Sequence, residues 1–118
     1  TDLALGDPAI EAADAADPML SVEPLRATGR WWAGPDDVRS PEVSPLFADL
    51  AGLPPVHIFQ GERDLFAVTS RQLAAKLQEA RVPTEYVEYP GAFHVHVTAR
   101  FTPEARHTLR RIGEAVRP

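Results

Sequence analysis

The chain has 118 residues, of which 44% are hydrophobic and 25% are charged, so it has the size of one domain with a modest core. This composition excludes a disordered tail, and no apolar run is long enough to cross a bilayer. A net charge of -5 without a Lys/Arg cluster argues against a nucleic-acid binder. The absence of cysteine excludes disulfides, a thiolate nucleophile and Cys-based metal sites, and it allows the cytoplasmic location that we expect.

Residues 1–54 hold most of the 12 prolines, which separate short segments, and we expect an irregular excursion with helical pieces there. The alanine-rich segment 8–16 is the first expected helical piece. Ser21 is the expected N-cap of a helix from Val22 to Ala33, which Gly34 ends.

The second half, residues 55–118, has a sharper pattern of a strand, an amphipathic helix, a second strand and a terminal helix. Short joints between these elements predict a βαβ unit with parallel strands, so the expected fold class is α/β. The expected elements are strands at Val56–Gln60 and Thr84–Tyr89, a helix at Val68–Arg81, and a last helix that Thr102 caps and Pro103 opens, with an apolar stripe of Ala105, Leu109, Ile112 and Val116.

Two polar residues follow the two predicted strands at similar distances. Asp64 lies four residues after the first strand, in GERD, and His94 lies five residues after the second, in YPGAFH. Parallel strands deliver their following loops to one edge of the sheet, so we expect a carboxylate oxygen of Asp64 within hydrogen-bonding reach of an imidazole nitrogen of His94. Such a contact fixes the imidazole tautomer. Each residue also has a structural alternative: Asp64 as a helix cap, and His94 as a loop histidine bonded to backbone.

The remaining histidines and the tryptophans have mostly structural interpretations. His96 and His94 form an H-x-H pair, but no third ligand stands nearby, so we expect neither a metal nor a cofactor. His57 lies inside a strand and His107 on the polar side of the last helix, and both are interpreted as structural. Two neighbouring tryptophans are interpreted as packing residues, with ligand stacking as the alternative: Trp31 and Trp32.

Three segments in combination resemble the C-terminal half of esterases in the hormone-sensitive-lipase-like family of α/β-hydrolases. They are DPML at 17–20, VSPLFADLAGLPPVHIFQGERD at 43–64 and EYPGAFHVHV at 88–97. The resemblance covers nearly the whole chain and implies that the two strands are the seventh and eighth of that fold. It also implies that Asp64 is the catalytic acid and His94 the catalytic histidine, while His96 matches a position that family members fill variously.

The chain departs from that family in what it lacks. The family carries a Gly-x-Ser-x-Gly nucleophile elbow and an H-G-G-G oxyanion segment, and this sequence has neither. Its four serines have no flanking glycines: Ser21, Ser40, Ser44 and Ser70. The chain alone is therefore not expected to hydrolyse esters.

Three functions remain open from the residues. The first is the C-terminal portion of a carboxylesterase that acts on a small ester, with the nucleophilic serine on a missing N-terminal half. The second is a non-catalytic remnant that serves as an interaction or scaffold module. The third is a small α/β binding domain, of which a nucleotide-binding version is disfavoured because the Gly-rich phosphate loop is missing. Because only two strands are expected, we also predict association with the missing half or with a second copy through a strand edge.

Overall fold

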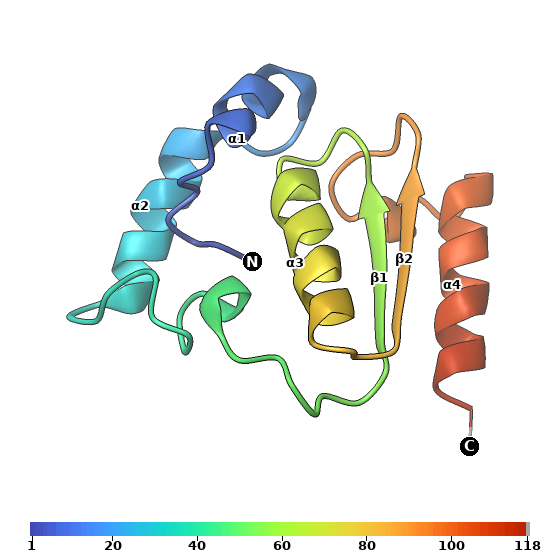
Figure 1. Cartoon of the computed structure of the whole chain (residues 1–118). Coiled ribbons are helices and arrows are strands. Elements are labelled where there is room, and N and C mark those ends of the chain that lie inside the picture. Colours follow the sequence, from blue (N-terminus) through green and yellow to red (C-terminus); the bar gives the residue numbers. More distant parts are fainter. Residues whose placement is uncertain (118) are drawn as a thin grey trace.

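The computed structural model, which describes residues 1–117, contains a parallel two-stranded sheet with helices on both sides (Figure 1). The parallel βαβ unit and the terminal helix predicted from the sequence are confirmed. The elements in chain order are α1 (Pro8–Ala13), η1 (Asp14–Ala16), α2 (Val22–Ala33), η2 (Pro45–Phe47), β1 (Val56–Gly61), α3 (Ala67–Glu79), β2 (Thr84–Tyr89), η3 (His96–Thr98) and α4 (Pro103–Ala115).

The strands pair in one register, from Val56 opposite Thr84 to Gly61 opposite Tyr89. Because successive side chains of a strand point to opposite faces, alternate residues of each strand meet different helices. Gln60 accepts a hydrogen bond from Ser70 of α3, at 2.7 Å, on one face of the sheet. On the other face, Glu85 of β2 pairs with Arg111 of α4 at 2.6 Å. The helices α3 and α4 therefore cover opposite faces.

The excursion of residues 1–54 lies on the side of α3 that faces away from α4 (Figure 1). Its buried side chains enter two small apolar clusters, which attach the excursion to the βαβ unit. One cluster joins Leu5, Ile10 and Val22 to Leu65, and the other joins Leu50 to Leu77 and Val82.

The helix α2 has the predicted bounds, with Ser21 at the N-cap position and Gly34 at its end, but two details of the excursion differ from expectation. The side chain of Ser21 makes no capping hydrogen bond to α2, and Asp14 instead accepts one from the backbone N–H of Val22 at 2.8 Å. The chain turns back after η1, so a carboxylate eight residues upstream reaches the helix end. Trp31 and Trp32 are 80% and 69% exposed, so they are not packing residues of the core.

The helix α3 ends two residues before the predicted end at Arg81. Arg81 has a φ of 59°, in the left-handed region, and the backbone N–H of Val82 donates to the carbonyl of Leu77. This left-handed residue turns the chain into β2.

The molecule is more open than a compact monomer of its size. Its radius of gyration is 14.9 Å, whereas about 13.5 Å is typical for this length. Its accessible surface is 7211 Å², and a compact monomer of this mass exposes about 6,300 Å². Among the described residues, no helix is long and apolar enough to span a membrane.

Asp17 ties the excursion to the loop between β1 and α3. Its side chain is buried and accepts hydrogen bonds from the backbone N–H groups of Met19, Leu20 and Leu65, the last at 2.8 Å. Burial raises the pKa of this carboxyl, but the three backbone donors outweigh that effect and hold its pKa below the usual value. Folding therefore favours the ionised form of Asp17.

Replacing Asp14 by Ala should lower the free energy of unfolding by about 1 kcal/mol, because the first turn of α2 loses its acceptor. Ser21→Ala is the matched control and should change it by less than about 0.5 kcal/mol, since the hydroxyl caps nothing. Urea unfolding of both variants at one pH measures the difference. Equal losses, or a larger loss for Ser21→Ala, would contradict the assignment of the cap.

Stability should depend on the ionisation of Asp17 in acid. Because its pKa is lower in the folded protein than the ordinary 3.8, the unfolded chain binds more protons between these values. The contribution of the ionised Asp17 carboxylate to the free energy of unfolding is thus fully present above pH 3.8, and it declines as the pH falls through the folded-state pKa. Asp17→Asn should be less stable than the wild type at pH 5 to 7, and denaturant titrations should show the gap narrowing in stronger acid. A gap that stays constant with pH would refute the ionic role.

Candidate active site

The loops that follow β1 and β2 are joined to each other by backbone contacts. The N–H of Arg63 donates to the carbonyl of Ala92 at 2.9 Å, and the N–H of Gly91 donates to a carboxylate oxygen of Glu62 at 2.8 Å. Gly61 permits this approach, because a Cβ there would lie 2.6 Å from the carbonyl oxygens of Ala92 and Phe93. The close fit places the residues after Gly61 beside those after Ala92.

Asp64 and His94 meet between these loops, as predicted. Nδ1 of His94 lies 3.0 Å from Oδ2 of Asp64. The other oxygen of Asp64 accepts a hydrogen bond from the N–H of Phe66 at 2.9 Å, at the entry to α3. Asp64 does not cap α3, whose N-cap residue is Phe66 without a side-chain cap, but the two contacts together orient its carboxylate, and the residue is only 7% exposed.

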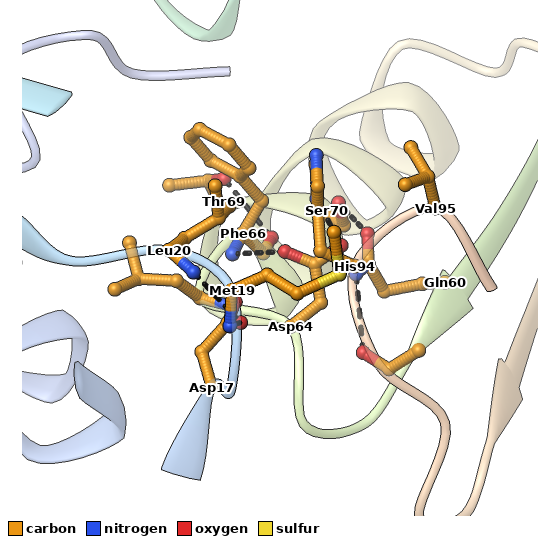
Figure 2. A network of polar contacts seen from close by, with 12 residues as sticks. Asp17, Met19, Leu20, Gln60, Asp64, Phe66, Thr69, Ser70, His94 and Val95 are labelled. Atoms are coloured by element: carbon orange, nitrogen blue, oxygen red, sulfur yellow. Dashed lines mark hydrogen bonds and ion pairs between the residues drawn. The ribbon is translucent and has the colours of Figure 1, made fainter. Parts of the chain in front are cut away.

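The outer side of the His94 ring remains accessible. Within residues 1–117, every buried side-chain nitrogen or oxygen has a hydrogen-bond partner, and none is found for Nε2 of His94, so this atom faces solvent. The side chain of His94 is 28% exposed, and its ring centroid lies 5.9 Å from that of Phe66. The Asp17 network adjoins the same region (Figure 2). The imidazole is thus held on one side and open on the other.

His96 points away from His94 and into the protein. Its Nε2 lies 2.9 Å from the hydroxyl oxygen of Thr108 in α4. Burial lowers the pKa of His96, although the carboxylates of Asp64 and Glu104 oppose this shift. No group of three His, Asp or Glu side chains suited to a metal ion occurs in the part of the chain that the structure describes.

The other two histidines contact side chains away from Asp64 and His94. Nδ1 of His57 lies 2.6 Å from a carboxylate oxygen of Glu85, its partner on the neighbouring strand. Nδ1 of His107 lies 2.7 Å from the hydroxyl oxygen of Tyr89. Neither contact joins the Asp64 and His94 pair.

Two of the four serines are held in internal hydrogen bonds. Ser44 is fully buried, accepts from the N–H of Leu3 and donates to the carbonyl of Val38, while Ser70 donates to Gln60. The bond to Leu3 links Ser44 to a residue 41 positions away, at the start of the chain.

One pocket is lined by the pair itself, and a second lies against the neighbouring Phe66. The first, of about 250 Å³, is lined by Asp64, His94, His96 and Thr108 among others. A second pocket of about 270 Å³ is almost entirely apolar and reaches Phe66, the ring beside His94, with walls formed by Leu3, Leu5, Leu25, Thr28, Gly29 and Trp32.

Sequence reasoning missed three residues that build this site. Gly61 directly follows the predicted strand Val56–Gln60 and carries no functional signal of its own, yet it allows the two loops to touch. Asp17 carries an Asp-Pro turn signal, but its link to Leu65 spans 48 residues. Thr108 lies within a helical pattern, where nothing local indicates a partner for His96.

Comparisons with known proteins agree with this geometry. The model of a family described as having the alpha/beta hydrolase fold matches residues 2–98. An esterase of Acinetobacter venetianus is 31% identical over 116 residues, covering 96% of this chain and 38% of that protein. An acetyl-hydrolase of Streptomyces hygroscopicus is 31% identical over 100 residues, covering 84% of this chain and 33% of that protein. The chain thus spans well under half the length of these relatives.

Solved structures give the same assignment. A hormone-sensitive lipase from a metagenome library superimposes with a TM-score of 0.88 at 27% identity, covering 94% of this chain and 38% of that one. An esterase from the bacterial hormone-sensitive lipase family gives a TM-score of 0.89 at 26% identity, with 96% and 38% covered. The α/β fold class predicted from the sequence is therefore confirmed. This chain belongs to the α/β-hydrolase family, and the solved structures that resemble it include esterases of the hormone-sensitive lipase family.

Proposed function

We propose that this chain supplies the acid and the histidine of a Ser-His-Asp triad in a carboxylic-ester hydrolase, with Asp64 and His94 as the catalytic residues. The observation that carries the proposal is the contact of 3.0 Å between Nδ1 of His94 and Asp64, with Nε2 open to solvent. A serine hydrolase needs its imidazole in this arrangement, because Nε2 must take the proton from the nucleophile. The esterase and acetyl-hydrolase relatives support ester hydrolysis.

The reaction follows from the two nitrogens of His94. Nε2 takes the proton of the serine hydroxyl while the serine oxygen attacks the ester carbonyl, and Asp64 stabilises the imidazolium through Nδ1–H. The tetrahedral intermediate collapses, and the imidazolium gives its proton to the leaving alcohol. Water then loses a proton to Nε2 and attacks the acyl-serine. As this second intermediate collapses, the imidazolium returns the proton to the serine oxygen, which releases the carboxylic acid and restores the serine.

The nucleophile and the oxyanion donors must come from polypeptide outside this sequence. None of the four serines has the flanking glycines of a nucleophile elbow, and no H-G-G-G segment is present. Preorganised oxyanion donors are usually the largest single contribution to such catalysis, so Asp64 and His94 alone are not expected to give measurable turnover. In this proposal, residues 1–54 and 55–118 are parts of one incomplete domain.

The partner is either the polypeptide with the serine or a second copy of this chain. Within the described residues each strand of the sheet pairs along one edge only. The free edge of β1 is formed by the largely apolar run VHIFQ. Open edges of this kind attract a further strand. The surface in excess of a compact monomer, about 900 Å², is of the size that one partner contributes to a standard interface.

The chain alone should show no hydrolysis of a short-chain p-nitrophenyl ester above the buffer rate. Once the serine-bearing polypeptide is supplied and activity appears, His94→Ala should lower kcat by about 10⁶-fold, because the general base is lost. Asp64→Asn should lower it less, by about 10⁴-fold, because an imidazole in the wrong tautomer remains.

His57→Ala is the matched control for these variants. It removes an imidazole that pairs with Glu85, so the assembled enzyme should keep its kcat. Robust activity of the chain alone would mean that the nucleophile lies within it, and an active assembled His94→Ala enzyme would refute the proposed base. A partner that never restores activity would favour the non-catalytic remnant.

The purified chain should associate at micromolar concentration, because a two-stranded sheet with open edges is marginal in water. Light scattering or sedimentation should give a mass above 12.9 kDa for the chain. Glu23→Ala is the control, since it removes an exposed charged side chain of α2 rather than apolar surface, and it should leave the association unchanged. A compact monomer with a cooperative thermal transition would show that residues 1–54 complete the fold by themselves.

A further inference from the structure

The residue after His94 has an unfavourable backbone conformation. Val95 has φ 49° and ψ 37°, in the left-handed region. A β-branched side chain is rarely found there, because its Cβ substituents crowd the backbone, and such a conformation persists only when its surroundings enforce it. The strain lies directly beside the imidazole that faces solvent, so whatever enforces Val95 also sets the position of His94.

The residue that follows Val95 is bound to α4. His96 and Thr108 are 5% and 2% exposed, and Nε2 of His96 lies 2.9 Å from the hydroxyl oxygen of Thr108. A buried imidazole without this partner would leave an unsatisfied polar atom, so the contact resists opening of the loop. His94 and His96 thus have separate partners on either side of the strained residue.

Further contacts hold the same stretch against β2 and α4. The ring of Tyr89, the last residue of β2, lies 4.8 Å from the ring of His96, and its hydroxyl contacts Nδ1 of His107 at 2.7 Å. Burial lowers the pKa of His96, so the neutral imidazole that suits this apolar setting is favoured, although Asp64 and Glu104 oppose the shift. The pocket of about 250 Å³ is lined by both the Asp64–His94 pair and the His96–Thr108 pair.

We infer that His96 and Thr108 are positioning residues for His94: their buried hydrogen bond holds Val95 in the left-handed region and thereby aims the imidazole at Asp64. This inference rests on the proposed function for the role of His94 in turnover, but its conformational part does not. If the hydrogen bond is removed, Val95 relaxes to a negative φ, and the preceding residue moves away from Asp64.

Thr108→Val tests the inference, because it keeps the branched shape of the side chain and removes the hydroxyl. In the labelled full chain, the ¹³Cα and ¹³Cβ shifts and the HN–Hα coupling of Val95 should report loss of the left-handed conformation. Thr108→Ser restores a hydroxyl and should keep the wild-type values. Val95 that stays left-handed in Thr108→Val would overturn the inference, whether or not any assembled enzyme is active.

In the assembled enzyme, Thr108→Val should lower kcat by about tenfold to a hundredfold through misplacement of the base. KM should remain within about twofold, because Thr108 is buried and its hydroxyl is engaged by His96, and Thr108→Ser should restore kcat. A purely structural role would reduce the amount of folded enzyme without changing kcat per folded molecule, and that result would contradict the positioning role.

Val95→Gly provides a second test in case Thr108→Val folds poorly. Glycine adopts the left-handed conformation without steric cost, so it should lessen the need for the hydrogen bond. The kcat loss caused by Thr108→Val should therefore be several-fold smaller in the Val95→Gly background than in the wild type. If Thr108→Val lowers kcat by the same factor in both backgrounds, Val95 and Thr108 do not act together.

Discussion

The site depends on the parallel pairing of β1 with β2 in one register. With Gly61 opposite Tyr89, the two following loops start level with each other, three residues before Asp64 and five before His94. A register shifted by one residue would turn the side chains at the strand ends to the wrong faces and would separate the carboxylate from the imidazole. Gly61 adds a second condition, because any side chain there would meet the carbonyls of the His94 loop.

Both catalytic candidates are held by groups outside the pair. The carboxylate of Asp64 is fixed by the N–H of Phe66 at the start of α3, and the neighbouring Leu65 is bound through its N–H by Asp17 of the excursion. The loop of His94 is attached to α4 through His96 and Thr108. The two halves of the pair therefore derive their positions from different parts of the chain, which meet only in the folded protein.

Much of this arrangement could be predicted from the sequence, because its signals are local. The two strand runs, the caps at Thr102 and Gly34 and the spacing from strand end to Asp64 and His94 are properties of short segments. The sequence gives no comparable signal for Asp14 as the cap of α2, for the link from Asp17 to Leu65, or for Thr108 as the partner of His96. These contacts join residues whose proximity is created by tertiary packing, and a local pattern carries no information about them.

The exposed tryptophans have a similar explanation. Apolar side chains on a helix favour burial, but the sequence does not say against what, and in residues 1–117 Trp31 and Trp32 remain exposed on α2. A chain that spans 38% of an esterase relative leaves such surfaces for other polypeptide to cover, if it belongs to a longer or divided enzyme as proposed.

The tautomer of His94 in the wild-type protein is the most direct measure of the central claim that Asp64 orients this imidazole for proton transfer at Nε2. Long-range ¹H–¹⁵N correlation spectra, recorded at a pH where the ring is neutral, distinguish the two nitrogens. We predict a protonated Nδ1, bound to Asp64, and an unprotonated Nε2 free to accept a proton. A neutral ring protonated at Nε2 would contradict it.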